Sequence, residues 1–194
     1  DACFIPVAAG GGIRSIEDAE VLLNSGADKI VLNTPFYTDQ ELIKKLVETF
    51  GSQCLIASVD YKMVDSKPVV HINNGSDAIE TPISEYLEQV VKLGAGELYL
   101  NSIDRDGTGQ GYELDIFDHI NHKLNIPIIL SGGAGNYNHL IEGHSKPHVD
   151  AVATANLFNF VGSGIPTARK MMKESGIEIP EWNGEELQSL KNIF

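Results

Sequence analysis

The chain has 194 residues, of which 42% are hydrophobic, and a formal charge of −13. A chain of this size and apolar content is long enough to bury the core of one domain. Its negative charge excludes the phosphate attraction on which nucleic-acid-binding proteins depend, because no cluster of Lys or Arg offsets it locally. No apolar run approaches the roughly 18–20 residues of a membrane span. Cys3 and Cys54 lack the spacing of a zinc site or a disulfide framework, which favours a reducing compartment. We therefore predict a cytoplasmic protein that has no metal or other cofactor and binds neither nucleic acid nor membrane.

Six short β-branched segments alternate with amphipathic helical segments, a pattern typical of parallel βαβ units. The expected strands are 4–9, 29–33, 54–60, 97–103, 126–131 and 150–155. Ser15 and Thr38 are each followed three residues later by an acid, which predicts capping boxes at two helix starts. Gly26 and Gly94 are expected to end helices in the left-handed conformation. Residues 61–81 are interpreted as a hairpin excursion, and residues 177–194 as a C-terminal tail.

An internal repeat links the first and fifth of these strands. Gly10-Gly11-Gly12 recurs as Ser131-Gly132-Gly133, and Asp28 recurs as Asp150, at offsets of 121 and 122 residues. A period that spans four βα units implies a total of eight, the number at which a parallel barrel closes. We therefore predict an α/β fold in which residues 1–194 form one partial domain, about six units (strands 3–8) of a TIM (βα)8 barrel. Two units are then expected before residue 1, and the alternative is a complete, doubly wound sheet of six strands.

The repeated glycine turns are candidates for phosphate binding, because the loops after the strands of a parallel barrel form its active site. Glycine there lets a phosphate approach backbone N–H groups. Each turn is paired with the polar end of the following strand, Asn33-Thr34 in one case and Asn156 in the other, just before a helix. We predict two phosphate sites related by the repeat, with a tight turn that binds no ligand as the alternative for each.

Asp60 ends the third expected strand and is a candidate general acid or base. Its alternative roles are an ion pair with Lys62 and a helix cap. After the fourth strand, Asp106, Gly107 and Thr108 could bind hydroxyl or phosphate groups.

Three further groups of charged or titratable residues have alternative interpretations. Asp104 and Arg105 could form a structural pair. His119 and His122 share a helix face without an acidic shell, which favours surface positions over a metal site. At the opposite rim, Lys29 and Glu97 open two strands, and charges inside a barrel are costly unless paired. They are interpreted either as a salt bridge that plugs the barrel or as a gate.

The ordered motifs of the chain resemble those of the cyclase subunits of imidazole glycerol phosphate synthase, the lyase of histidine biosynthesis. The resemblance runs from residue 4 to about residue 178. Its motifs are residues 7–14, 26–29, 32–34, 50–54, 59–62, 94–97, 102–108 with 111–112, and 131–135.

The resemblance implies a (βα)8-barrel lyase with two phosphate sites for the two ends of a ribulosyl phosphoribosyl aminoimidazole carboxamide. Ammonia from a glutaminase subunit, docked as a heterodimer partner on the N-terminal face of the barrel, would pass through the barrel. Reaction of this ammonia with the substrate would give imidazole glycerol phosphate and aminoimidazole carboxamide ribotide. By the same resemblance Asp60 is a catalytic base and acid, and Lys29 and Glu97 belong to an ammonia gate. The implied substrate-binding and phosphate-binding residues are Gly12, Asn33, Thr34, Asp106, Gly107, Thr108, Ser131, Gly133 and Asn156.

Departures from the family pattern leave other functions open. The family's first catalytic aspartate would precede residue 1, so we expect little or no turnover by this chain alone. Asn101 stands where the family pattern has threonine, and the segment 156–160 also differs. One alternative is therefore a paralogue that channels ammonia for amidination of surface sugars. Another is a non-catalytic barrel that only docks a glutaminase.

Overall fold

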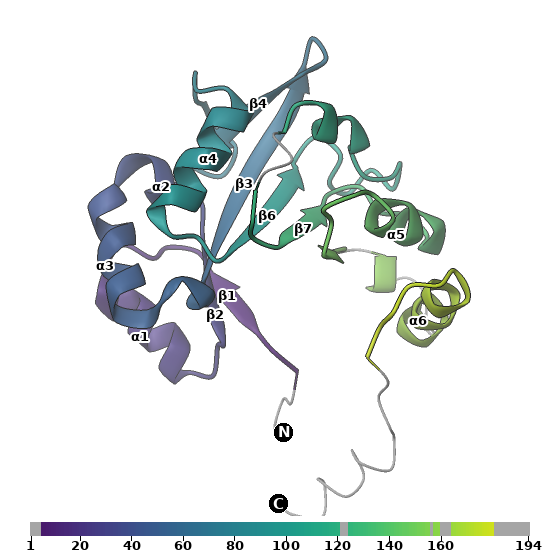
Figure 1. Ribbon diagram of the computed structural model, residues 1–194, viewed down its shortest axis with the longest axis horizontal. Helices are drawn as coiled ribbons and strands as arrows, with labels where there is room; N and C mark the ends of the chain where they lie inside the picture. The colour runs from purple at the N-terminus through teal and green to yellow at the C-terminus, as the bar shows by residue number, and fades with distance from the viewer. Residues whose placement is uncertain (1–4, 121–123, 156, 160–163, 181–194) are drawn as a thin grey trace, which may run out of the picture.

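The computed structural model describes residues 5–120, 124–155, 157–159 and 164–180 (Figure 1). The strands are β1 (Ala8–Gly10), β2 (Lys29–Leu32), β3 (Leu55–Val64), β4 (Lys67–Ile72), β5 (Asp77–Ala78), β6 (Glu97–Ser102), β7 (Ile128–Ser131) and β8 (Ala151–Val152). The α-helices are α1 (Ile16–Asn24), α2 (Pro35–Thr38), α3 (Gln40–Phe50), α4 (Ile83–Leu93), α5 (Tyr137–His144) and α6 (Gly164–Glu174). Short 3-10 helices cover Ser52–Cys54, Leu114–Asp118 and Leu157–Asn159.

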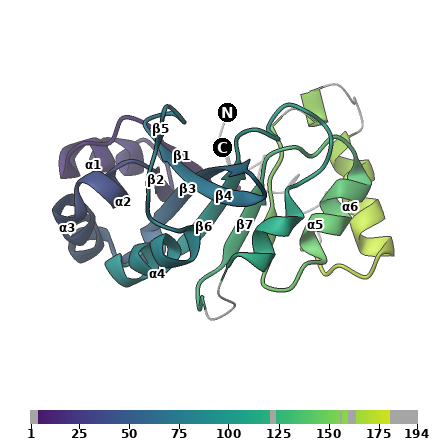
Figure 2. The ribbon, with the colours of Figure 1, turned by 90° about the horizontal axis from the view of Figure 1, so that it is seen from above.

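The main sheet consists of parallel strands in the order β1-β2-β3-β6-β7-β8. This order follows the chain without a reversal, whereas a doubly wound sheet reverses its strand order at a switch point. Figure 2 shows the helices along the outside of the curved sheet. The predicted partial (βα)8 barrel is confirmed, and the alternative of a doubly wound sheet is wrong.

The apolar core lies between the sheet and its helices. Leu55, Ala57 and Val59 alternate along β3 and are all fully buried, as expected for the face that packs on helices. Ser58 and Asp60, which alternate with them, are only partly buried. The inner face of the sheet therefore carries polar side chains toward the carboxyl ends of the strands.

The helix ends follow local capping chemistry, with one correction. Ser15 caps α1 by accepting a hydrogen bond from the Asp18 N–H at 3.1 Å, as predicted, and Gly94 ends α4 in the left-handed conformation. The prediction that Thr38 caps α3 is wrong, because Asp39 accepts from the Leu42 N–H at 3.0 Å instead. Thr38 is the last residue of the short helix α2, which the sequence analysis did not predict.

The internal repeat extends to equivalent contacts in the fold. Asp28 accepts a hydrogen bond from the Val7 N–H at 2.8 Å, and Asp150 accepts from the Ile128 N–H at 2.9 Å. Each aspartate thus fixes the start of the strand one unit earlier in the chain. Asn136 caps α5 through the His139 N–H at 3.1 Å, as Ser15 caps α1.

Residues 61–81 form a hairpin that rises from the rim of the barrel. β3 continues past Asp60 to Val64 and pairs antiparallel with β4, after a turn at Asp65 and Ser66 in which both residues have positive φ. The chain turns again at residues 73–75 and pairs β4 with the short strand β5. Asp60 therefore lies in the middle of a long strand, directly opposite His71.

None of the helices in the described ranges has the length and apolarity that crossing a bilayer requires. Of the predicted tail, residues 177–180 are described and follow α6, while residues 181–194 lie outside the described part. His122 also lies outside it, and His119 follows the 3-10 helix Leu114–Asp118.

Candidate active site

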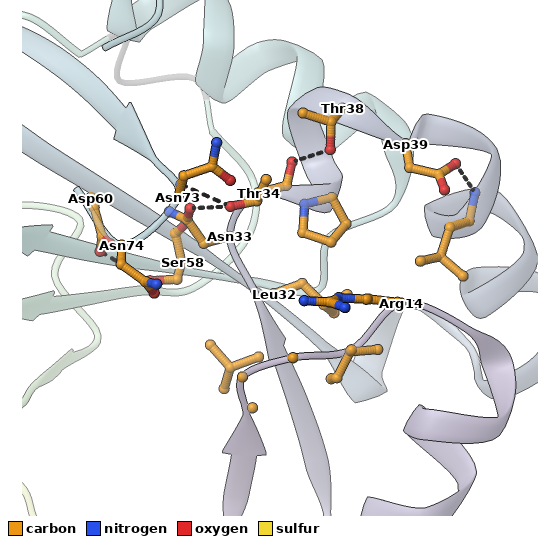
Figure 3. A pocket seen from close by; sticks show the side chains of 17 residues that line it. Arg14, Leu32, Asn33, Thr34, Thr38, Asp39, Ser58, Asp60, Asn73 and Asn74 are labelled. Carbon is orange, nitrogen blue, oxygen red and sulfur yellow. Dashed lines mark hydrogen bonds between the residues drawn. The ribbon is translucent and has the colours of Figure 1, made fainter. Parts of the chain in front are cut away.

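Two pockets open at the carboxyl ends of the parallel strands. The first has a volume of about 680 Å³ and lies over β1, β2 and β3 (Figure 3). Its lining includes the predicted residues Gly12, Asn33, Thr34 and Asp60. The further polar residues of its lining are Arg14, Thr38, Asp39, Ser58, Asn73 and Asn74, none of which was predicted as a site residue.

The second pocket, of about 230 Å³, lies beside β7 and the loop that follows β6. Asp106, Gly107, Thr108 and Gly133 line it, as the predicted second phosphate site requires. Ser131 does not belong to its lining, because this residue is 6% exposed and its hydroxyl is hydrogen-bonded to the Tyr99 hydroxyl at 2.6 Å. Asn156 lies outside the described residues, although its neighbour Ala155 lines the pocket.

The two glycine turns share a backbone conformation that favours glycine. Gly11 and Gly12 have φ of 103° and 72°, and their repeat partners Gly132 and Gly133 have φ of 94° and 101°. A side chain at Gly133 would also meet the Gly111 carbonyl oxygen, 2.2 Å from the Cβ position. Glycine is therefore required at both turns by the backbone conformation, and at Gly133 also by close packing against Gly111.

The hairpin is fastened to the first pocket through the strand end at Asn33 and Thr34. The Asn33 amide donates to the carbonyl oxygens of Ser58 and His71, at 3.0 and 3.4 Å. The Asn73 N–H donates to the Thr34 hydroxyl at 3.0 Å, and that hydroxyl donates to Asn33 Oδ1 at 3.2 Å. The hairpin thus forms one wall of the pocket. Asn73 and Asn74 of this wall belong to residues 61–81, the predicted hairpin excursion.

Asp60 is held by two neighbouring side chains on the inner face of the sheet. The Asn101 amide and the Ser58 hydroxyl both donate to Asp60 Oδ1, at 3.1 and 3.3 Å. Lys62 is not among the described hydrogen-bond partners of Asp60, so the alternative of an ion pair between them receives no support. The arrangement leaves Oδ2 of Asp60 for contact with a ligand.

Burial raises the pKa of the Asp60 carboxyl above its ordinary value, against the opposing effects of the Asn101 and Ser58 hydrogen bonds and the nearby His71. A carboxylate with a raised pKa is a better proton acceptor, and its acid form persists to higher pH. The side chain is therefore suited to taking up and returning a proton during a reaction.

The loop after β6 is fixed by an ion pair that the sequence analysis assigned differently. Arg105 donates from Nε and Nη2 to Glu113 Oε2, at 3.1 and 2.9 Å, and Glu113 is almost fully buried. Asp104 instead accepts from the Ser102 hydroxyl at 2.9 Å and from the Met63 N–H at 3.2 Å. The suggested pair of Asp104 with Arg105 is wrong, because Glu113 lies nearer in space although it is farther along the chain.

Lys29 and Glu97 form a salt bridge on the inner face, at the amino-terminal ends of β2 and β6. On β6 the alternate residues Glu97, Tyr99 and Asn101 face the same side, so this strand carries a polar side chain at each level from the bottom of the barrel to Asp60.

Within the described ranges, no group of three His, Cys, Asp or Glu side chains is arranged to hold a metal ion.

Comparison with known proteins connects this arrangement to one family. A family model described as "Histidine biosynthesis protein" matches residues 1–163. The chain is 42% identical over 176 residues to "Imidazole glycerol phosphate synthase subunit HisF" of Chlorobaculum tepidum, an alignment that covers 91% of this chain and 70% of that relative. Relatives with the same name in Chlorobaculum parvum and Prosthecochloris aestuarii are 41% and 42% identical, with the same coverage.

Proposed function

The chain belongs to the histidine biosynthesis protein family, among the relatives of the HisF subunits of imidazole glycerol phosphate synthase, and we propose that it catalyses the ammonia-dependent lyase and cyclase reaction of such an enzyme. In this reaction a ribulosyl phosphoribosyl aminoimidazole carboxamide and ammonia give imidazole glycerol phosphate, aminoimidazole carboxamide ribotide and water, the water carrying away the oxygen of the carbonyl with which ammonia condenses.

One observation carries the proposal, namely that the two repeat-related glycine turns, after β1 and β7, lie on either side of β3 in the strand order, and that Asp60 of β3 lines the first pocket. The first pocket lies over β1 to β3, and the second lies beside β7. Asp60, on β3, is next to β6 in the strand order β1-β2-β3-β6-β7-β8. A substrate with one phosphate at each glycine turn would therefore pass Asp60 between its two ends. This matches the class of substrate that the family resemblance implies.

In the proposed reaction Asp60 accepts a proton from the substrate and returns it as the imidazole ring closes. Asn101 and Ser58 hold Oδ1, so the proton moves through Oδ2. The N–H groups of the turns at Gly12 and Gly133 would hold the phosphates, which restricts the motion of the reacting atoms. General acid–base catalysis by one positioned side chain contributes typically about 10²–10⁴-fold to a rate.

The proposal includes a glutaminase partner on the N-terminal face of the barrel. The relatives are named as subunits of a synthase, and the salt bridge of Lys29 with Glu97 lies at the end of the barrel away from Asp60. We assign this pair to a gate through which ammonia enters. A pair that opens and closes needs modest strength, which suits partners whose side chains are 33% and 20% exposed.

Genetic complementation tests this function. The complete gene that contains this sequence is expressed in a histidine auxotroph that lacks its own cyclase subunit, in parallel with its Asp60→Asn variant. Growth with the unchanged gene and none with the variant supports the proposal. Failure of the unchanged gene, in cells that contain the folded protein, contradicts it.

Asn101 favours a second candidate, the paralogue that channels ammonia for amidination of surface sugars. Its amide contacts Asp60 at the position where the family pattern has threonine, so this change affects the reacting carboxylate directly. This candidate predicts no rescue of the auxotroph, together with stimulation of a glutaminase. If stimulation persists and Asp60→Asn impairs neither ammonia-dependent reaction, the chain is only a docking barrel.

A further inference from the structure

The two pockets are related by the repeat but differ in their charged side chains. Arg14 lines the first pocket. At the repeat offset that matches Gly12 with Gly133, the position equivalent to Arg14 is occupied by Gly135, which lines the second pocket. The lining of the second pocket includes no Lys or Arg among the described residues. The first glycine turn therefore has a cation in the lining of its pocket, whereas the cation next to the second turn, Arg105 beside Gly133, is paired with Glu113.

The Arg14 side chain is placed to meet an anion at the first turn. Figure 3 shows it projecting into the pocket from the turn that precedes α1, toward the side where Thr34 and Asn33 lie. Its backbone N–H donates to Asp18 Oδ2 at 2.8 Å, which fixes the base of the side chain. No acceptor is hydrogen-bonded to its guanidinium in the part of the chain that the structure describes. The donors of Arg14 are thus available, and a guanidinium matches phosphate geometry with two parallel N–H groups.

The exposed Asp18 carboxylate attracts the Arg14 charge, whereas the two acidic residues that line the first pocket are placed elsewhere. Asp39 accepts from the Leu42 N–H at the start of α3, so its charge faces a helix N-terminus. Asp60 lies beyond Asn33 from Arg14 in Figure 3, on the hairpin side of the pocket. In the second pocket the charged residue of the described lining is Asp106, which repels an anion.

We propose that Arg14 makes the first pocket the stronger of the two phosphate sites, and that a substrate with two phosphate ends is captured there first. The inference rests on the proposed function, because it takes both pockets as phosphate sites. It adds a residue and an order of affinity to that proposal. A fixed order of capture would also orient a substrate whose two ends differ.

Phosphate titration followed by NMR tests the inference without turnover. Inorganic phosphate is added at constant ionic strength to ¹⁵N-labelled protein, and the amide signals of Gly12 and Gly133 report the two pockets separately. Gly12 is expected to respond with an apparent Kd about three- to tenfold lower than that of Gly133, the contribution of one partly solvated guanidinium. Arg14→Gln should remove this difference and leave the Gly133 response unchanged, and Arg14→Lys should keep part of it.

Lys67→Gln provides the matched control, because it removes one positive charge from an exposed residue of the hairpin that does not line the first pocket. It should leave the difference intact, and the dispersion of the spectra checks that each variant is folded. Equal affinities of the two glycine turns in the unchanged protein, or an effect of Lys67→Gln as large as that of Arg14→Gln, would overturn the role of Arg14 while leaving the proposed function standing. The absence of any response at both glycines would overturn the inference together with the two phosphate sites of the proposed function.

Discussion

Substitution of Glu113 by Gln tests how the loop of the second pocket is held. This residue accepts two hydrogen bonds from Arg105, and the Arg105 side chain is 34% exposed while that of Glu113 is 9% exposed. Breaking a fully buried ion pair costs about 3–5 kcal/mol, and breaking an exposed one about 0.2–1 kcal/mol. Because one partner is buried and the other is in partial contact with water, we expect Glu113→Gln to lower the free energy of unfolding by about 2 kcal/mol.

Urea unfolding followed by circular dichroism measures this loss, with Glu41→Gln as the matched control. Glu41 pairs with Lys44 on α3, and its side chain is 74% exposed, so its replacement should cost less than about 0.5 kcal/mol. The denaturant dependence should be the same in both variants, since neither changes the surface exposed on unfolding. Equal losses in the two variants would refute the reasoning from burial.

Three further substitutions test the reacting carboxylate and the bottom of the barrel. In the complete cyclase subunit, Asp60→Asn should lower ammonium-dependent turnover by at least about 100-fold in initial-rate assays. The same substitution should also raise the free energy of unfolding at neutral pH, because burial raises the pKa of this carboxyl and so disfavours its charged form in the folded protein. This stabilisation is complete above the raised pKa and vanishes below the ordinary value of 3.8. Asn101→Leu removes a hydrogen-bond donor that favours the charged form of Asp60, so a carboxyl ¹³C titration should show the pKa of Asp60 raised further. The acid limb of the pH–rate profile should move to higher pH for the same reason. Lys29→Met should lower the free energy of unfolding, measured in urea, by about 1 kcal/mol at most. It should lower glutamine-driven turnover more than ammonium-driven turnover.

The outcome for Asp60→Asn that would count against the raised pKa is a loss of stability at neutral pH. For Asn101→Leu it is an unchanged titration of Asp60. For Lys29→Met it is an equal fall in the two turnover rates, which would leave the salt bridge as a plug without a role in ammonia transfer.

The architecture was predictable because local sequence patterns, which recur along the chain, determine it. The alternation of strands and helices, and the repeat of Gly12 and Asp28 at Gly133 and Asp150, predicted a barrel wall in chain order. Even the capping residues Ser15 and Asn136 occupy repeat-related positions. Such signals depend on neighbours in the chain, which a sequence displays directly.

The details of the site were less accessible because they depend on contacts between distant residues. Glu113 pairs with Arg105 across a loop, and the turn at Asn73 and Asn74 becomes a pocket wall only because β3 extends to Val64 and folds back. Thr38 illustrates the same limit at short range, since α2 ends at this residue and leaves the capping of α3 to Asp39. None of these arrangements follows from periodicity, because each depends on where another segment lies.

In the proposed function one substrate reaches from the glycine turn of the first pocket, past Asp60, to the glycine turn of the second. The most direct measurement is a titration of the protein with the bisphosphorylated ribulosyl substrate in the absence of ammonia, followed through the amide signals of Gly12 and Gly133 and by calorimetry. Our account predicts that both signals change with one common Kd and that one molecule binds per chain. Binding of two molecules per chain, or a response at Gly12 with none at Gly133, would contradict it.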